Sequence, residues 1–155
     1  MALTMAQLIG TPAHADALDL DRAIEIGKKA SGGSSAVAVG RVVFLTGSSG
    51  VWAIATAGST GRMGVVPKLA PANVDADTEI TVMAGVGAEI YVEAAGAIKP
   101  GSQVLPTTGG KVIATTAAGI GIYKGHYGEG SGLGNPPTDA ANAEAVRISL
   151  TGRII

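Results

Sequence analysis

The chain contains no cysteine, and its large aromatic side chains are few. Without cysteine it has no disulfide, no thiolate metal ligand and no cysteine nucleophile. One Phe, one Trp and three Tyr occur among 155 residues, and the 46% of residues that are hydrophobic are mainly Ala and Val. A core of small side chains buries little apolar area per residue. We therefore expect one small domain that gains stability from self-association, because a partner that binds only the folded form stabilises it.

An excess of charge of one sign and long apolar runs are also missing. The chain has 11 Lys and Arg against 12 Asp and Glu, with a formal net charge of −1, and its basic residues are scattered. Because nucleic-acid binding relies on basic surfaces that neutralise phosphates, we expect no nucleic-acid partner. No uninterrupted apolar run reaches the roughly 18 residues of a membrane span, and no signal-peptide pattern begins the chain. The sequence therefore predicts a soluble chain without a membrane partner.

Two glycine-rich patterns within residues 107–125, TTGGKVIATTAAGIGIYKG, invite comparison with phosphate-binding loops. A Walker loop needs a glycine five positions before its Gly-Lys pair and Ser or Thr after it. Here Leu105 precedes Gly110 at that distance, and Val112 follows the lysine. A dinucleotide-binding loop needs a third glycine at the position where Lys124 stands. The spacing therefore predicts no nucleotide cofactor, and we assign these glycines to turns and to close strand approach.

The remaining motifs supply no catalytic or metal-binding chemistry. The two histidines, His14 and His126, lie far apart in sequence, and neither stands in a triad pattern. Asp75, Asp77 and Glu79 alternate as calcium ligands do, but the glycine that an EF-hand loop needs at its sixth position is absent. We interpret this segment as a solvated turn. The sequence predicts that the protein is not an enzyme and has no catalytic, cofactor-binding or metal-binding residues.

Residues 1–35 are predicted to form an N-terminal arm that ends in a flexible Gly/Ser joint, SGGSS, at 31–35. Residues 16–29 leave two alternatives. Alternating Leu and Ile residues favour a strand, whereas a short capped helix with an apolar stripe is the other interpretation.

Residues 36–155 are predicted to form a β-rich domain of short segments separated by Gly, Pro and Ser. The last segment alternates Val146, Ile148 and Leu150 with polar residues, which is typical of a strand with one buried face. The fold class predicted is mainly β, a small β-barrel or β-sandwich of short antiparallel strands with an extended N-terminal arm. A long loop is expected at 128–142. The predicted strands are 41–46, 51–56, 63–69, 79–84, 88–94, 102–107, 111–116, 119–125 and 144–154.

A weak internal repeat relates residues 36–64 to residues 97–125 at an offset of 61. Each copy reads as a glycine turn, a strand, a second glycine turn and a second strand. The tip of the second hairpin is expected at Gly109-Gly110, with Lys111 solvated at its edge. The glycines predicted to serve the backbone in this way are Gly40, Gly50, Gly101, Gly110 and Gly121.

The segment AEIYVEAAGAIKPGSQVLPTTGGKVIATTAAGIGIYKG, at 88–125, and the later strand EAVRISL resemble the capsid cement (head decoration) proteins of tailed bacteriophages. In that family a strand is followed by V-x-A-x-G-x-I-x-x-G-x-x-V, a Gly-Lys turn, an Ala/Thr-rich strand and a terminal V-x-V-x-L strand. The resemblance covers residues 36–155 and leaves the N-terminal arm unmatched. The matching residues are Val92, Ala94, Gly96, Ile98, Gly101, Val104, Gly110, Lys111, Ala114, Gly121, Val146, Ile148 and Leu150.

The resemblance implies a structural virion protein, made in the host cytoplasm, on the outer face of a phage capsid. Its partners would be the major capsid protein and two further copies of itself. Such a homotrimer would sit at three-fold or quasi-three-fold positions and clamp adjacent capsomers, stabilising the capsid against internal pressure.

Contact with the capsid is assigned to the N-terminal arm as a hypothesis, because arms of this kind order on binding. The apolar residues expected to contact the shell are Leu3, Leu8, Ile9, Leu18 and Leu20. A disordered terminus without a contact role is the alternative for the arm. For the whole chain the alternative is a non-catalytic β-domain that binds carbohydrate or peptide, which the low aromatic content disfavours.

Overall fold

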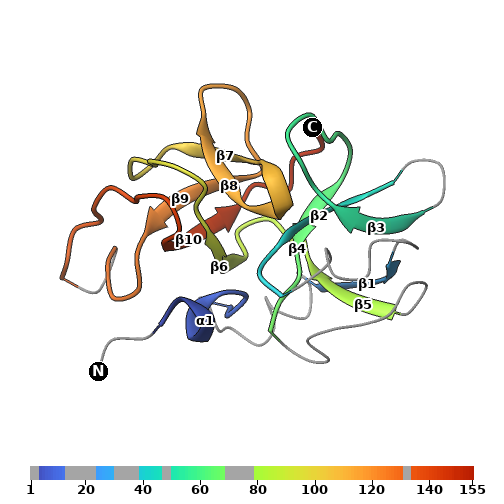
Figure 1. Cartoon of the computed structure of the whole chain (residues 1–155), viewed down its shortest axis with the longest axis horizontal. Coiled ribbons are helices and arrows are strands. Elements are labelled where there is room, and N and C mark those ends of the chain that lie inside the picture. The colour runs from blue at the N-terminus through green and yellow to red at the C-terminus, as the bar shows by residue number, and fades with distance from the viewer. Residues whose placement is uncertain (1–3, 13–23, 30–38, 47–49, 69–78, 131–133) are drawn as a thin grey trace.

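The computed structural model describes the chain at residues 4–12, 24–29, 39–46, 50–68, 79–130 and 134–155. These residues form two sheets of five strands each, which lie side by side, and a short helix near the N-terminus (Figure 1). The elements are α1 (Met5–Leu8), β1 (Ile24–Lys29), β2 (Val42–Leu45), β3 (Val51–Ile54), β4 (Met63–Val65), β5 (Glu79–Met83), β6 (Glu89–Glu93), β7 (Gln103–Pro106), the 3-10 turn η1 (Thr108–Gly110), β8 (Val112–Thr115), β9 (Gly121–Gly125) and β10 (Ala145–Leu150).

The first sheet curls into a small barrel with the strand order β1-β3-β2-β4-β5, in which β5 pairs with β1 to close the ring. Four of the neighbouring pairs are antiparallel, whereas β1 and β3 are parallel, with Lys28 opposite Val51. A ring of five strands cannot alternate direction at every step, so its closure requires one parallel pair. This parallel pair is the exception in a fold whose other ladders are antiparallel, as the sequence predicts.

The second sheet has the strand order β6-β10-β9-β7-β8, and all of its ladders are antiparallel. Its two outer strands approach each other at one point, where Ala94 and Val112 form an isolated parallel bridge. There the Ala95 amide donates to the Val112 carbonyl at 2.8 Å. The second sheet is therefore also strongly curved, and β9 is its central strand, between β10 and β7.

The two copies of the sequence repeat form one hairpin in each sheet. The strands of the first hairpin, β2 and β3, become the bounds of β7 and β8 when 61 is added to their residue numbers. The registers differ by one residue, because Val43 faces Ile54 whereas Val104 faces Ala114. The tip of the second hairpin docks on the first, where the Gly110 amide donates to the Ala55 carbonyl at 3.0 Å.

The core runs between the two sheets without interruption. Alternation along β2 directs Val42 into the shared core and Val43 into a second cluster that belongs to the barrel, where it meets Trp52. In the second sheet, β10 alternates as predicted, with Val146, Ile148 and Leu150 buried and the residues between them part-exposed. Tyr123 on β9 is the largest fully buried side chain among the described residues.

The described part of the predicted arm packs against the domain. Helix α1 begins with a capping box in which the Thr4 amide donates to the Gln7 side chain at 2.8 Å. Beyond the helix, the Gly10 amide donates to the Tyr91 carbonyl in β6 at 2.8 Å, and the Gly10 carbonyl accepts from the Lys68 amide at 2.7 Å. Because these bonds reach both sheets, residues 4–12 join the two sheets and do not form a free extended arm.

The mainly β fold is confirmed, and each strand from β2 to β10 lies within a predicted segment. For residues 16–29 the strand alternative is correct at Ile24–Lys29; residues 16–23 and the joint at 31–35 lie outside the described residues. Among the described residues, no helix combines the length and the apolar character that a membrane crossing requires.

Candidate functional site

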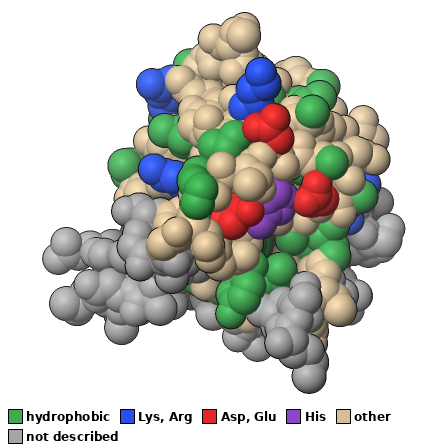
Figure 2. All heavy atoms as spheres, turned by 90° about the vertical axis from the view of Figure 1, so that its left-hand side faces the viewer, with side chains coloured by type: hydrophobic (Ala, Val, Ile, Leu, Met, Phe, Trp, Pro, Cys, Tyr) green, Lys and Arg blue, Asp and Glu red, His purple; other side chains and the backbone are tan. Residues whose placement is uncertain are grey.

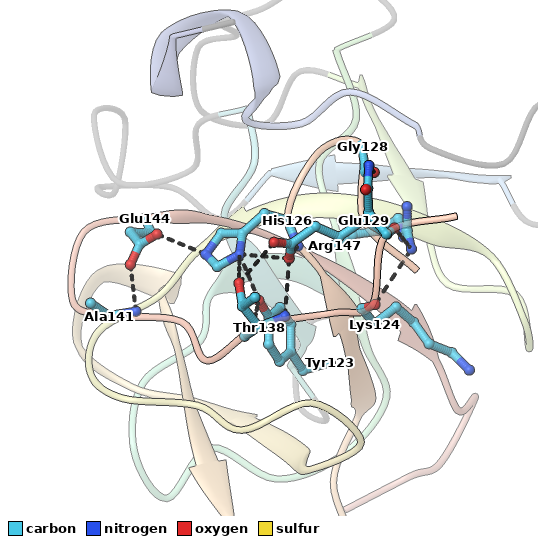
Figure 3. A network of polar contacts seen from close by, with 10 residues as sticks. Tyr123, Lys124, His126, Gly128, Glu129, Thr138, Ala141, Glu144 and Arg147 are labelled. Carbon is cyan, nitrogen blue, oxygen red and sulfur yellow. Dashed lines mark hydrogen bonds and ion pairs between the residues drawn. The ribbon is translucent and has the colours of Figure 1, made fainter. Parts of the chain in front are cut away.

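The densest group of polar contacts lies where β9 leads into the loop that returns to β10. Residues 126–144, described except at 131–133, connect the two strands and are here called the return loop. Because β9 and β10 are antiparallel neighbours, with Gly125 opposite Arg147, the two ends of the return loop lie side by side. This pairing brings His126 and Glu144 together from opposite ends of the loop (Figure 3).

His126 lies between two carboxylates. Its Nδ1 atom is 2.9 Å from Oε1 of Glu129, and its Nε2 atom is 2.7 Å from Oε2 of Glu144. The Nε2 atom is buried and makes no hydrogen bond, so that its contact with Glu144 is an ion pair only when the ring is protonated. The side chain is 21% exposed, and Figure 2 shows a histidine side chain at the surface between acidic side chains.

The Glu129 carboxylate accepts hydrogen bonds from three groups besides the imidazole. The amides of His126 and Thr138 donate to its Oε1 atom at 2.9 and 3.2 Å, and the Thr138 hydroxyl donates to its Oε2 atom at 2.8 Å. Burial opposes ionisation of this carboxyl, but the hydrogen bonds from His126 and Thr138 outweigh burial and lower its pKa to about 2. The Glu129 carboxyl is therefore charged at neutral and at mildly acidic pH.

The buried side chain of Tyr123 contacts His126 and Thr138. Its phenol donates to the Thr138 carbonyl at 2.9 Å, and its ring meets the imidazole of His126 edge-on at a centroid distance of 6.0 Å. Burial, reinforced by the charges of Glu129, Glu144 and Asp139, raises the pKa of the phenol well above its ordinary value. The Tyr123 hydroxyl is therefore a neutral donor whose proton is already engaged.

Arg147 ties the return loop to the second sheet. Its Nη2 atom donates to the Glu129 carbonyl at 2.7 Å, and its Nε atom forms an ion pair with Glu89 of β6 at 3.2 Å. Arg147 also lowers the pKa of the Tyr91 phenol, but burial of Tyr91 has the larger, opposite effect and leaves that pKa raised. The loop is thus held by contacts with β6, β9 and β10.

These contacts fix the position of the return loop. Both ring nitrogens of His126 face carboxylates, so that neither is placed to take a proton from a bound molecule. In the part of the chain that the structure describes, no group of three His, Cys, Asp or Glu residues is arranged to hold a metal ion. The site is best understood as the anchor of a surface loop.

Backbone strain in this site gives a first prediction. Ala143 has φ of 65°, the one positive value at a non-glycine residue in the described ranges, in the turn where Glu144 accepts from the Ala141 amide at 2.6 Å. A Cβ atom disfavours this backbone conformation by about 1–2 kcal/mol, so that glycine would relieve strain in the folded state. Glycine also increases the entropy of the unfolded chain, which offsets part of that gain. We therefore expect Ala143→Gly to raise the free energy of unfolding by about 0.5 kcal/mol. Urea denaturation measures it. Ala141→Gly is the control and should lower stability; a loss of stability in both variants would contradict the prediction.

A second ionic cluster joins the two hairpin copies. Glu93, at the end of β6, pairs with Arg41 at 3.0 Å and with Lys111 at 2.9 Å. Arg41 precedes β2 and Lys111 precedes β8, so that one carboxylate connects both sheets. The expectation that Lys111 is solvated at the hairpin edge is therefore corrected, because Glu93 lies within its reach.

Of the residues predicted to contact a capsid, two pack against the domain and three lie outside the described residues. The Leu8 side chain is 6% exposed and packs on the domain. Ile9 is part-buried against Gly40, where an added Cβ atom would lie 1.9 Å from the Ile9 Cγ2 atom. Leu3, Leu18 and Leu20 lie outside the described residues, so that a contact role for them stays a prediction.

Four of the five glycines assigned to the backbone have a positive φ, and Gly110 is also buried. Gly121 differs, because it lies in β9 and its Cα faces Ile148, whose Cδ1 atom would be 3.1 Å from an added Cβ. It therefore serves close strand approach and not a turn. The four with positive φ are Gly40, Gly50, Gly101 and Gly110.

The histidine site was not predicted from the sequence, where His126 was considered only as a triad member and found to lack a triad pattern. The local signal is a histidine followed three positions later by a glutamate. The partners Thr138 and Glu144 come from the far half of a loop, and no periodic pattern points to them.

Comparison with known proteins finds no family model and no curated protein that matches this chain. Among solved structures, the chain is similar to the head fiber gp8.5 N base of bacteriophage phi29, with 13% sequence identity and a TM-score of 0.48. The similar region covers 85% of this chain and 96% of that chain. A likeness of this size does not carry a function from one chain to the other.

Proposed function

We propose that this chain is a non-enzymatic structural virion protein that binds the outer surface of a phage capsid. Three copies, placed at three-fold or quasi-three-fold positions, would clamp adjacent capsomers and so stabilise the shell. The chain would be made in the host cytoplasm and would have the major capsid protein as its partner.

The observation that carries this proposal is the place of the family-like motif in the fold. Seven of the eight apolar residues of the motif lie in the core that the two sheets share, each 4% exposed or less, whereas the eighth, Ala114 on β8, is exposed. The apolar positions of the motif thus serve the core of the domain, as the family-like architecture would require. The seven buried residues are Val92, Ala94, Ile98, Val104, Val146, Ile148 and Leu150.

The polar and glycine positions of the motif support the same interpretation. Gly110 and Lys111 form the tip that docks the second hairpin on the first, through the Ala55 carbonyl and the Glu93 carboxylate. Gly101 adopts φ of 83° in the turn before β7. Motif residues of these types therefore act on the architecture and not on a ligand, as a structural protein requires.

The packing of residues 4–12 refines the proposed capsid contact. Leu8 and Ile9 hold this segment to the domain, so that they are engaged within the chain itself. A deletion of the whole arm, residues 2–15, would remove these contacts and destabilise the domain. Loss of capsid binding in such a variant would therefore not show that the arm makes the contact. We propose that Leu3, Leu18 and Leu20 make the contact instead.

Capsid binding gives the second prediction. Replacement of Leu3, Leu18 and Leu20 together by serine is expected to weaken binding to capsids by roughly a hundredfold or more, because each leucine buried in an interface contributes about 1.5–3 kcal/mol. Binding is measured by co-sedimentation of the purified chain with capsids, from the encoding phage, that lack it. Val86→Ser is the matched control, because Val86 is 80% exposed and has no proposed contact. Unchanged co-sedimentation of the leucine variant would contradict the assignment of the contact.

A further inference from the structure

The arrangement of protons around His126 restricts its charge state. Three groups approach the Nδ1 atom: Oε1 of Glu129 at 2.9 Å and the hydroxyls of Tyr123 and Thr138, each at 3.2 Å. Each hydroxyl has one proton. The Tyr123 proton is directed to the Thr138 carbonyl at 2.9 Å, and the Thr138 proton to Oε2 of Glu129 at 2.8 Å. All three groups therefore present lone pairs to Nδ1, which must carry a hydrogen.

The other ring nitrogen also lies beside a carboxylate, although it makes no hydrogen bond to it. The Nε2 atom is buried, and Oε2 of Glu144 lies 2.7 Å from it. A carboxylate at this distance attracts an N–H group and repels a nitrogen lone pair. A neutral imidazole has one N–H, whereas the imidazolium has two. Only the protonated ring satisfies Glu129 and Glu144 together.

We propose that His126 is a proton-dependent fastener of the return loop, which binds Glu144 when its ring is protonated and releases it when the Nε2 proton is lost. The proposal concerns this chain alone and stands apart from the proposed capsid role. The groups that face the ring or lie next to it are Glu129, Glu144, Tyr123, Thr138, Asp139 and Arg147.

Glu129 has more hydrogen-bond partners than Glu144, and this difference decides which carboxylate loses its contact with His126 when the ring becomes neutral. Glu129 keeps its bonds from the His126 amide and from both donors of Thr138 whatever the state of the ring, and these bonds hold its charge next to Nδ1. Glu144 has one further bond, from the Ala141 amide, and its side chain is 41% exposed. Water can therefore solvate Glu144 at little cost, so that the neutral ring keeps Nδ1–H and gives up Nε2–H.

Release of Glu144 would loosen one turn and leave the strands intact. The side chain of Glu144 caps the turn that contains the strained Ala143, through the Ala141 amide. The backbone of the same turn stays attached to the sheet, because the Ala143 amide donates to the Ala94 carbonyl at 2.8 Å. The pH-dependent change is therefore expected at residues 141–144 and not in β10.

The test uses the full-length His14→Gln variant, in which His126 is the one remaining histidine. Nuclear magnetic resonance of its ring nitrogens over a pH titration should show an imidazolium at the acidic end and the Nδ1–H tautomer at the basic end. Over the same titration the Ala141 amide should lose about tenfold in exchange protection, corrected for intrinsic rates. The Leu150 amide, which donates to the Ala88 carbonyl, is the internal control and should not change.

A second variant separates the proposed contact from a general effect of pH. Glu144→Gln removes the charge that faces Nε2, so that the Ala141 amide should lose its dependence on the ring titration while the return loop remains held by Glu129. Two results would overturn the proposal. One is a neutral ring that keeps its Nε2–H, and the other is exchange protection of the Ala141 amide that does not change as the ring titrates in the His14→Gln protein.

Discussion

Replacing Gly110 with alanine is expected to lower the free energy of unfolding by about 3 kcal/mol, as the sum of backbone strain and overpacking. A Cβ atom at this position would lie 2.6 Å from the Ile54 Cδ1 atom and 2.8 Å from the Val42 carbonyl oxygen. The Ile54 side chain can move, but the carbonyl belongs to β2 and cannot. The second hairpin would therefore have to withdraw from the first, which stretches the bond from the Gly110 amide to the Ala55 carbonyl.

The neighbouring glycine supplies the control for this experiment. Gly109 also has a positive φ, of 69°, but an added Cβ atom there meets nothing within 4 Å. Gly109→Ala should therefore cost only the backbone strain, about 1 kcal/mol. Chemical denaturation of both variants measures the difference. Equal losses of stability would show that the hairpin contact is not restrictive and would contradict the close docking of the two hairpins.

Replacing Glu129 with glutamine is expected to lower the free energy of unfolding by about 2 kcal/mol at neutral pH, a value reduced from the full linkage to allow for partial solvent screening. The carboxylate accepts from two amides and one hydroxyl, and a glutamine amide group offers one acceptor atom and a donor that faces donors. The pKa of Glu129 is lowered from 4.5 to about 2. A lowered folded-state pKa means that the contribution is complete above about pH 4.5 and disappears as the pH falls to about 2.

The stability difference between the wild type and Glu129→Gln should therefore be present at neutral pH and shrink as the pH falls below about 5. Denaturation with urea at several pH values measures this profile. Asp139→Asn removes the same charge from an exposed position of the same loop and is expected to have little effect. A difference that persists undiminished at about pH 2, or an equal loss in the Asp139 variant, would contradict the role assigned to Glu129.

The strands could be predicted from the sequence because each has a local cause. Val146, Ile148 and Leu150 alternate with polar residues, and all three are buried in β10. Gly and Pro residues separate the segments that became β2 to β10. The order of these strands has no such local signal, and the parallel pairing of β1 with β3 follows only from closing a ring of five.

The position of residues 4–12 and the histidine site could not be predicted, because both depend on contacts between distant residues. Gly10 approaches Gly40 so closely that an added Cβ atom would lie 3.0 Å from the Gly40 amide nitrogen, and neither glycine differs locally from a turn glycine. Similarly, His126 and Glu144 are eighteen positions apart in the chain and meet only because β9 pairs with β10. A sequence pattern identifies such residues only after the strand order is known.

Binding to the outside of a capsid is the central claim of the proposed function, and cryo-electron microscopy of capsids mixed with the purified chain tests it most directly. The capsids are those of the encoding phage, prepared without this chain. The account predicts added density on the outer surface at three-fold or quasi-three-fold positions, with three copies at each position. Capsids that remain bare at saturating protein, or density confined to another location, would contradict it.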